Sequence, residues 1–191
     1  MGLEVCGPHD DACTLACRSN LVDYLEVLRD HNSPWTEQTS TAAASLGHYE
    51  ALKYVLEGGC AAGNDIVLCA ARVGSLPVLM YLIEDQVLYM REDGSVFGAA
   101  FERAHVECLT YLVDQGCPFC LYTFPGPDMW PVFVRFRQED SAYDARLALC
   151  IDFMIARYKW ARDNNLAAFL DAHRLTFPLC VARIQAEEWI V

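Results

Sequence analysis

Apolar and polar residues along the first two thirds of the chain alternate with roughly the 3.6-residue period of an amphipathic helix. Between Leu21 and Arg29, for example, the apolar residues Leu21, Tyr24, Leu25 and Leu28 fall on one helical face. Short breaks that contain glycine or asparagine separate such segments. The pattern therefore predicts pairs of short helices joined by turns, each with one buried face.

These predicted helix pairs repeat along the chain. The segment 43–55 opens with two alanines, has a glycine at position 47 and closes with apolar residues. Similar segments begin 27 residues later at Ala70, 30 residues after that at Ala100 and, more weakly, 27 residues earlier at Ala16. A period of about 30 residues of this kind indicates a helical repeat, in which each unit buries its face only against its neighbours.

One position in each repeat should end the first helix of the pair. Asn20, Gly47 and Gly74 occupy it in the first three repeats, and both residue types tolerate the left-handed backbone that such an end requires. In the fourth repeat the position is Ala104, whose side chain makes this conformation more costly. We expect the fourth turn to be strained or built differently.

The segments Gly47-His48-Tyr49-Glu50 and Ala104-His105-Val106-Glu107, followed by Gly59-Cys60 and Gly116-Cys117, resemble the ankyrin repeat over residues 11–120. The resemblance implies an all-α, ankyrin-like helical solenoid of about four units. It also implies that the two histidines bond to backbone in the turn between helices, which argues against an acid–base role with Glu50 and Glu107. The family's Thr-Pro-Leu-His opening is absent, so we expect its projecting hairpins to be trimmed to turns.

The sequence changes character after Cys120. Pro125, Pro127 and Pro131 interrupt an aromatic-rich passage and exclude a continuous helix there. Ser141 then stands at capping-box spacing before Asp144, which predicts a long helix from Ser141 to about residue 162, with shorter helices after it. We therefore expect two segments: a repeat array over 1–120, and an aromatic-rich connector with a helical C-terminal cap over 121–191.

Composition favours a soluble intracellular protein. Of the 191 residues 54% are apolar, which argues against disorder. No apolar run approaches the roughly 18 residues that would span a bilayer, and the acidic start of the chain does not resemble a signal peptide. The 10 cysteines fall mostly at apolar helical positions, where reduced thiols act as small hydrophobic groups. A reducing compartment, cytoplasmic or nuclear, is expected.

Negative charge is concentrated in the repeats. Residues 1–120 hold 6 basic and 17 acidic side chains, whereas residues 121–191 hold 8 and 9, within a net charge of −12. Such a field disfavours nucleic acid and anionic membrane as partners and favours encounter with a basic protein. An acidic surface that only keeps the protein soluble is an equally good interpretation.

The ankyrin resemblance implies binding through loop tips and the exposed side of each first helix. The residues at these positions are Trp35, Glu37, Gln38, Asn64, Asp65, Arg72, Arg91, Glu92, Asp93 and Glu102. Trp35 is the strongest single candidate, because large aromatic side chains beside turns often anchor interfaces; the alternative is that it packs between successive repeats. The expected function is protein–protein interaction by a monomer, through an acidic concave face.

The main alternative is a small-molecule binder or an enzyme, with a pocket between the repeats and the aromatic segment. The side chains that could line such a pocket are Tyr122, Asp128, Trp130, Tyr143 and His173. Nothing in their spacing fixes a reaction, so no catalytic residue is assigned.

Two cysteine arrangements in the sequence have spacings that could support a chemical site. Cys117 and Cys120 have the spacing of dithiol oxidoreductases, but the strands that such a domain needs are not predicted. A second group, Cys6, His9, Cys13 and Cys17, could bind zinc. However, Cys17 replaces an interior alanine of the repeat, and the spacing matches no common zinc module. We assign no metal and no cofactor.

Overall fold

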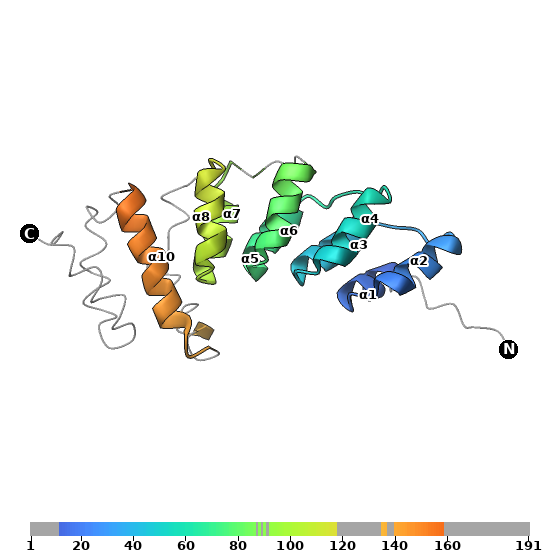
Figure 1. The fold of residues 1–191 in the computed structure, drawn as a ribbon, viewed down its shortest axis with the longest axis horizontal. Helices are drawn as coiled ribbons and strands as arrows, with labels where there is room; N and C mark the ends of the chain where they lie inside the picture. The colour runs from blue at the N-terminus through green and yellow to red at the C-terminus, as the bar shows by residue number, and fades with distance from the viewer. Residues whose placement is uncertain are drawn as a thin grey trace, which may run out of the picture. The chain divides into compact units, whose positions relative to one another are not determined.

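The computed structural model describes residues 12–86, 88, 90, 92–117, 135–136 and 140–158. All regular structure in these ranges is helical, with no β-strand, which confirms the predicted all-α class (Figure 1). The chain forms two compact units, Met1–Met90 and Arg91–Val191. The boundary predicted after residue 120 falls inside the second unit.

The first unit contains three helix pairs. They are α1 (Ala12–Arg18) with α2 (Val22–Asp30), α3 (Glu37–Ser45) with α4 (Tyr49–Glu57), and α5 (Ile66–Val73) with α6 (Leu76–Met80), which continues as the π-helical turn η1 (Tyr81–Asp85). The first helices α1, α3 and α5 pack side by side as one layer, and the second helices α2, α4 and α6 form the other.

Small residues let the first helices approach closely, and one leucine anchors each second helix. Ala43, Ala44, Ala70 and Ala71 are wholly buried, as an alanine pair between close helices should be. In the second helices the repeat-equivalent leucines are also wholly buried, namely Leu25, Leu52 and Leu79. Burying one such side chain contributes about 1.5–3 kcal/mol.

The turn between the two helices is the same in all four repeats. The residue after the left-handed position donates its amide hydrogen to the carbonyl five residues earlier, in the pairs Leu21–Ala16 (3.0 Å), His48–Ala43 (3.0 Å), Ser75–Ala70 (3.3 Å) and His105–Ala100 (3.0 Å). The left-handed residues are Asn20 (φ 53°), Gly47 (φ 72°), Gly74 (φ 77°) and Ala104 (φ 57°). This is the Schellman arrangement, and it confirms the predicted turn position. Ala104 has the same left-handed backbone as the other three residues, although its Cβ atom makes this conformation more costly than for glycine.

The second helices also end alike, except in the third repeat. The amides of Ser33, Cys60 and Cys117 donate to the carbonyls of Leu28 (3.0 Å), Val55 (2.9 Å) and Leu112 (2.8 Å). Before each donor lies a left-handed residue, Asn32, Gly59 or Gly116. The third repeat instead runs on through η1, where the amide of Gln86 donates to the carbonyl of Tyr81 at 3.1 Å.

The predicted apolar face of α2 is only partly correct. Leu25 is wholly buried and Leu28 is half-buried, but Leu21 is 53% and Tyr24 is 51% exposed. The helical period places these residues near one another, whereas burial also needs a neighbouring element, and no described element covers this side of α2. No helix in the described part of the chain is long and apolar enough to span a membrane.

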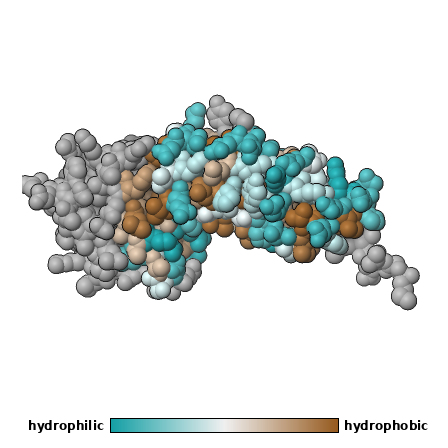
Figure 2. Space-filling model, in the orientation of Figure 1, coloured by the Kyte–Doolittle hydropathy of each residue, from teal (hydrophilic) through white to brown (hydrophobic). Residues whose placement is uncertain are grey.

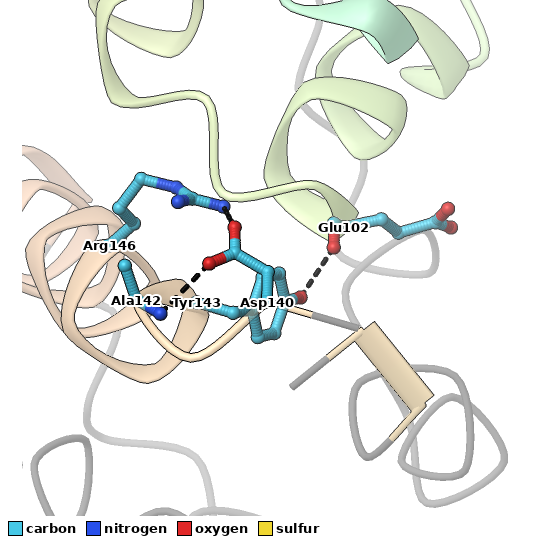
Figure 3. Close-up of polar contacts among 5 residues, drawn as sticks. All are labelled: Glu102, Asp140, Ala142, Tyr143 and Arg146. Carbon is cyan, nitrogen blue, oxygen red and sulfur yellow. Dashed lines mark hydrogen bonds and ion pairs between the residues drawn. The ribbon is translucent and has the colours of Figure 1, made fainter. Parts of the chain in front are cut away.

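The second unit contains α7 (Ser95–Glu102), α8 (Val106–Asp114), a helical turn at Arg135–Phe136 and α10 (Tyr143–Tyr158). Helix α10 packs against α8. Its first residue, Tyr143, is buried and donates its hydroxyl hydrogen to the carbonyl of Glu102 at the end of α7 (Figure 3). The Tyr143 ring lies 5.7 Å from that of Phe136, whose face is covered by the Arg103 guanidinium at 4.0 Å.

Asp140, and not Ser141, organises the start of α10. Its carboxylate accepts hydrogen bonds from the amide of Ala142 at 2.8 Å and from the guanidinium of Arg146 at 2.6 Å (Figure 3). These two donors, Arg146 first, hold the pKa of Asp140 below its ordinary value. The helix was predicted to begin at Ser141 and instead begins at Tyr143, because the carboxylate of Asp140 reaches both donors in the turn before it.

Candidate functional site

A polar groove of about 400 Å³ lies on the layer of first helices in the first unit. Helix α1 contributes Thr14 and Arg18. Helix α3 contributes half of the ten lining residues, and the loop before α5 completes the lining. The remaining lining residues are Glu37, Gln38, Thr41, Ala42, Ser45, Gly63, Asn64 and Asp65. Three consecutive repeats therefore build one site.

The floor of the groove requires glycine at position 63. A Cβ atom there would lie 2.2 Å from Oγ1 of Thr41 and 3.3 Å from the carbonyl oxygen of Glu37. Oγ1 of Thr41 itself donates to that carbonyl at 2.7 Å, so it is not free to move away without losing the bond. Nearby, Oγ of Ser40 donates to the carbonyl of Ala61 at 2.8 Å. The loop is thus held directly against α3.

Eight of the ten residues that line the groove are polar or charged, and the charges are of both signs. Glu37 and Asp65 supply carboxylates, and Arg18 supplies a guanidinium at the α1 end. The hydroxyls of Thr41 and Ser45 donate to carbonyls of their own helix, which leaves their lone pairs as acceptors. These groups can form hydrogen bonds and ion pairs with a bound polypeptide segment.

Four of the predicted partner-binding residues meet in this groove: Glu37, Gln38, Asn64 and Asp65. Glu37 and Asn64 lie 27 residues apart, as do Gln38 and Asp65, so the two pairs occupy equivalent places in successive repeats. Arg72 is exposed in the last turn of α5 and does not line the groove.

Trp35 packs between the first and second repeats. Its ring lies 4.2 Å from the guanidinium of Arg29 on α2 and 6.0 Å from the ring of Tyr54 on α4. A Cβ atom on Gly58 would lie only 2.3 Å from the Trp35 ring, so glycine is needed there. The ring is partly buried and is not among the groove residues, and its stacking corresponds to the packing alternative considered from the sequence.

The other predicted partner-binding residues belong to the second unit. Glu92 and Asp93 are exposed before α7, and Oδ1 of Asp93 accepts a hydrogen bond from the amide of Ser95 at 2.9 Å, which stabilises the start of that helix. The backbone carbonyl of Glu102 is used by Tyr143, while its carboxylate points away from Asp140 (Figure 3). Arg91 lies outside the described residues.

The alternative pocket rests almost wholly on residues outside the described ranges. Tyr122, Asp128, Trp130 and His173 are among them. Tyr143, the remaining member, has its hydroxyl committed to the carbonyl of Glu102. Its observed contacts are those of a packing residue.

His48 bonds to backbone, as the resemblance implied, and the carbonyl that it contacts belongs to the preceding repeat. It is the residue before α4, and its Nδ1 lies 3.0 Å from the backbone carbonyl of Cys17 at the α1 end. Ser75 holds the equivalent place in the third repeat, and its hydroxyl donates to the carbonyl of Gly47 at 3.4 Å. Both side chains bond to the backbone of the preceding repeat.

The described cysteines are mostly buried. Burial raises the pKa of Cys117 to about 11, whereas a reactive dithiol needs a lowered pKa. Its predicted partner Cys120 lies outside the described residues, as do Cys6 and His9. In the ranges that the structure describes, no cluster of three or more potential ligands could hold a metal ion.

Most carboxylates of the first unit lie on the second helices, a distribution that was not predicted from the sequence. Seven of the nine in residues 12–90 are there, all of them exposed: Asp23, Glu26, Asp30, Glu50, Glu57, Glu84 and Asp85. Burial raises the pKa of Tyr54 on α4, and the nearby charges of Glu26 and Asp30 raise it further. The groove itself is therefore less acidic than the opposite layer.

Comparisons of the sequence with protein-family models and with curated proteins gave no match. The functional inference therefore depends on the geometry and charge of the first unit.

Proposed function

We propose that this chain is an ankyrin-like repeat protein that binds a protein partner through the groove on its first-helix layer. The observation that carries the proposal is the alignment of equivalent positions from successive repeats, Glu37 with Asn64 and Gln38 with Asp65, along one groove. Repeat proteins commonly bind through such continuous surfaces, because stacking places the same position of each unit in a row.

The groove favours a polar segment that carries a basic side chain. Glu37 and Asp65 offer carboxylates to a lysine or arginine, and Arg18 at the α1 end can donate hydrogen bonds to an acidic group or a backbone carbonyl. The groove is lined by ten residues, whereas each side of a standard interface contributes about 20–30 residues. The full contact must therefore extend along the first helices beyond the groove.

Long-range charge supports the same class of partner. The exposed carboxylates on α2, α4 and η1 add to the field of a chain with net charge −12. This field accelerates encounter with a basic protein, and salt screens it. Specific recognition would be determined by the groove, and the rate of association by the whole acidic surface.

Capture of partners from a lysate, with a matched pair of variants, tests the proposal. The immobilised wild-type chain is compared with Glu37→Lys/Asp65→Asn in the groove and with Glu50→Lys/Glu57→Gln on α4, which changes the net charge equally. Captured proteins are quantified at about 50 mM and about 500 mM salt, where the Debye length falls several-fold. A groove-bound partner should be retained by the wild type and by the α4 variant, and lost from the groove variant.

Two results would contradict the proposal. A partner that the groove variant retains at the wild-type level does not use the groove. A partner that both variants lose equally responds only to net charge. In either case the groove is not the recognition site.

A further inference from the structure

The first helix pair exposes several large apolar side chains. Eight large apolar side chains are exposed in the described residues, and four belong to this pair: Leu15 (45%), Leu21 (53%), Tyr24 (51%) and Val27 (49%). Figure 2 shows brown, hydrophobic surface at this N-terminal end of the described chain. These four residues are called the end face below.

The equivalent positions in the later repeats indicate what the end face is suited to contact. Tyr24 corresponds to Ala51 in the second repeat and to Val78 in the third, and both of these are wholly buried. Leu15 corresponds to Ala42, which is buried, and to Cys69, which is half-buried. α1 and α2 pack against α3 and α4, and among the described residues no helix lies on their other side. The end face therefore has the form of a helix-packing surface with its partner missing.

Acidic residues run along the same helix as this apolar surface. Asp23, Glu26 and Asp30 are exposed at positions three and four residues apart on α2, so they form a line beside Tyr24 and Val27. The one basic residue in this helix, Arg29, stacks over the ring of Trp35. The end face is thus an apolar stripe with a negative margin.

Charge decides between the possible occupants. A second copy of this chain would bring two acidic margins together, and like charges at an interface are costly. The chain's own residues 1–11 include the apolar Leu3 and Val5. The charged side chains in this segment are Glu4, Asp10 and Asp11, which are negative like those of α2. A helix with an apolar stripe and flanking lysines or arginines complements both parts of the surface.

We propose that the end face binds a basic amphipathic helix of a partner protein. Its apolar side chains would contact Leu21, Tyr24 and Val27 from the position that a preceding repeat would occupy, and its basic residues would face Asp23, Glu26 and Asp30. An amphipathic helix that lays its apolar side on a partner's hydrophobic surface is a recurring mode of peptide recognition. The surface is separate from the polar groove, which α1 lines with Thr14 and Arg18, so either proposal can fail without the other.

A pair of synthetic peptides tests the proposal on the full chain. The probe is a leucine–lysine peptide of about 18 residues with leucines spaced to form one helical stripe, and the control has the same composition in an order without an apolar face. Fluorescence anisotropy compares three chains: the wild type, Tyr24→Ser/Val27→Ser, and the groove variant Glu37→Lys/Asp65→Asn. Tyr24 and Val27 are about half exposed, so the first variant should fold, and circular dichroism checks this.

The amphipathic peptide should bind the wild type roughly tenfold or more tightly than the control peptide, equivalent to about 1.4 kcal/mol. Tyr24→Ser/Val27→Ser should remove this preference, and the groove variant should keep it. Neutralising the margin with Asp23→Asn/Glu26→Gln/Asp30→Asn should weaken binding and reduce its salt dependence.

Several outcomes would overturn the proposal. Equal binding of both peptides would show simple charge attraction, and an unchanged preference in Tyr24→Ser/Val27→Ser would place the site elsewhere. A dimer in sedimentation experiments that this variant abolishes would identify a second copy as the occupant. Tighter peptide binding by Leu3→Ser/Val5→Ser would show that the chain's own N-terminal segment occupies the face.

Discussion

Single residues in left-handed backbone positions determine the geometry of the helix pairs. Gly47 has a second role, because its neighbourhood is crowded: a Cβ atom would lie 3.0 Å from Cβ and 3.3 Å from Oγ of Ser75 in the next repeat. Gly59 has the same kind of backbone, with φ of 90°, but nothing lies within 4 Å of a Cβ placed on it. The two glycines therefore separate the effect of backbone strain from that of contact between repeats.

Alanine substitution should distinguish the two effects. Gly59→Ala is expected to destabilise the first unit by about 1–2 kcal/mol, the cost of a left-handed non-glycine residue. Gly47→Ala should cost about 1 kcal/mol or more beyond this, because its methyl group overpacks the contact with Ser75. Free energies of unfolding from urea titrations would measure both. Equal losses would show that the contact between the two repeats tolerates a methyl group.

At the scale of elements, buried thiols lie within the helices of the second unit. Cys108 on α8 and Cys150 on α10 are almost fully buried, and these two helices pack together. Burial raises the pKa of Cys108 from its ordinary value of 9.0 to about 11 and that of Cys150 to about 12. Folding therefore favours the protonated thiols, which act as small apolar groups.

This packing predicts a loss of stability in alkali. A pKa that is higher in the folded than in the unfolded state contributes stability that is complete below about pH 9 and is lost as the pH rises toward 11–12. Hydrogen exchange of α8 and α10 should therefore accelerate, beyond the intrinsic base-catalysed rate, between about pH 9 and pH 10.5. The double variant Cys108→Ala/Cys150→Ala should show a smaller change. The same pH dependence in both proteins would assign the effect to other groups.

At the scale of the whole molecule, negative charge is the dominant long-range feature. The net charge is −12, and the exposed carboxylates of the first unit lie mainly on its second helices. Mutual repulsion among such groups destabilises the folded state. Salt at 0.1 M largely screens the repulsion between exposed charges that lie more than about 10 Å apart. This acidity affects folding as well as the choice of partner.

Salt should therefore stabilise the protein. Raising the salt concentration from about 20 mM to about 300 mM is expected to raise Tm by about 2–4 °C, equivalent to about 1 kcal/mol for a chain of this size. Asp23→Asn/Glu26→Gln/Asp30→Asn should show a smaller rise, because repulsion on α2 has been removed. Scanning calorimetry would measure both. A wild-type Tm that does not change or that falls with salt would contradict the expectation.

The sequence by itself determined the helix pairs, their turns and part of the candidate groove. These features depend on local properties: glycine or asparagine where the backbone is left-handed, and alanine where helices approach closely. The period also placed Glu37 with Asn64, and Gln38 with Asp65, at equivalent positions, so their alignment along one groove followed from the repeat.

Only the tertiary structure decided which surfaces are covered. Tyr24 and Ala51 occupy the same position of the repeat, yet Tyr24 is half exposed and Ala51 is wholly buried. The hydrogen bonds of Asp140 before α10 and the stacking of Trp35 on Arg29 likewise depend on groups that only the folded chain brings together. A helical period fixes which residues share a face, but burial depends on the element that lies opposite, and that element comes from elsewhere in the chain or from a partner.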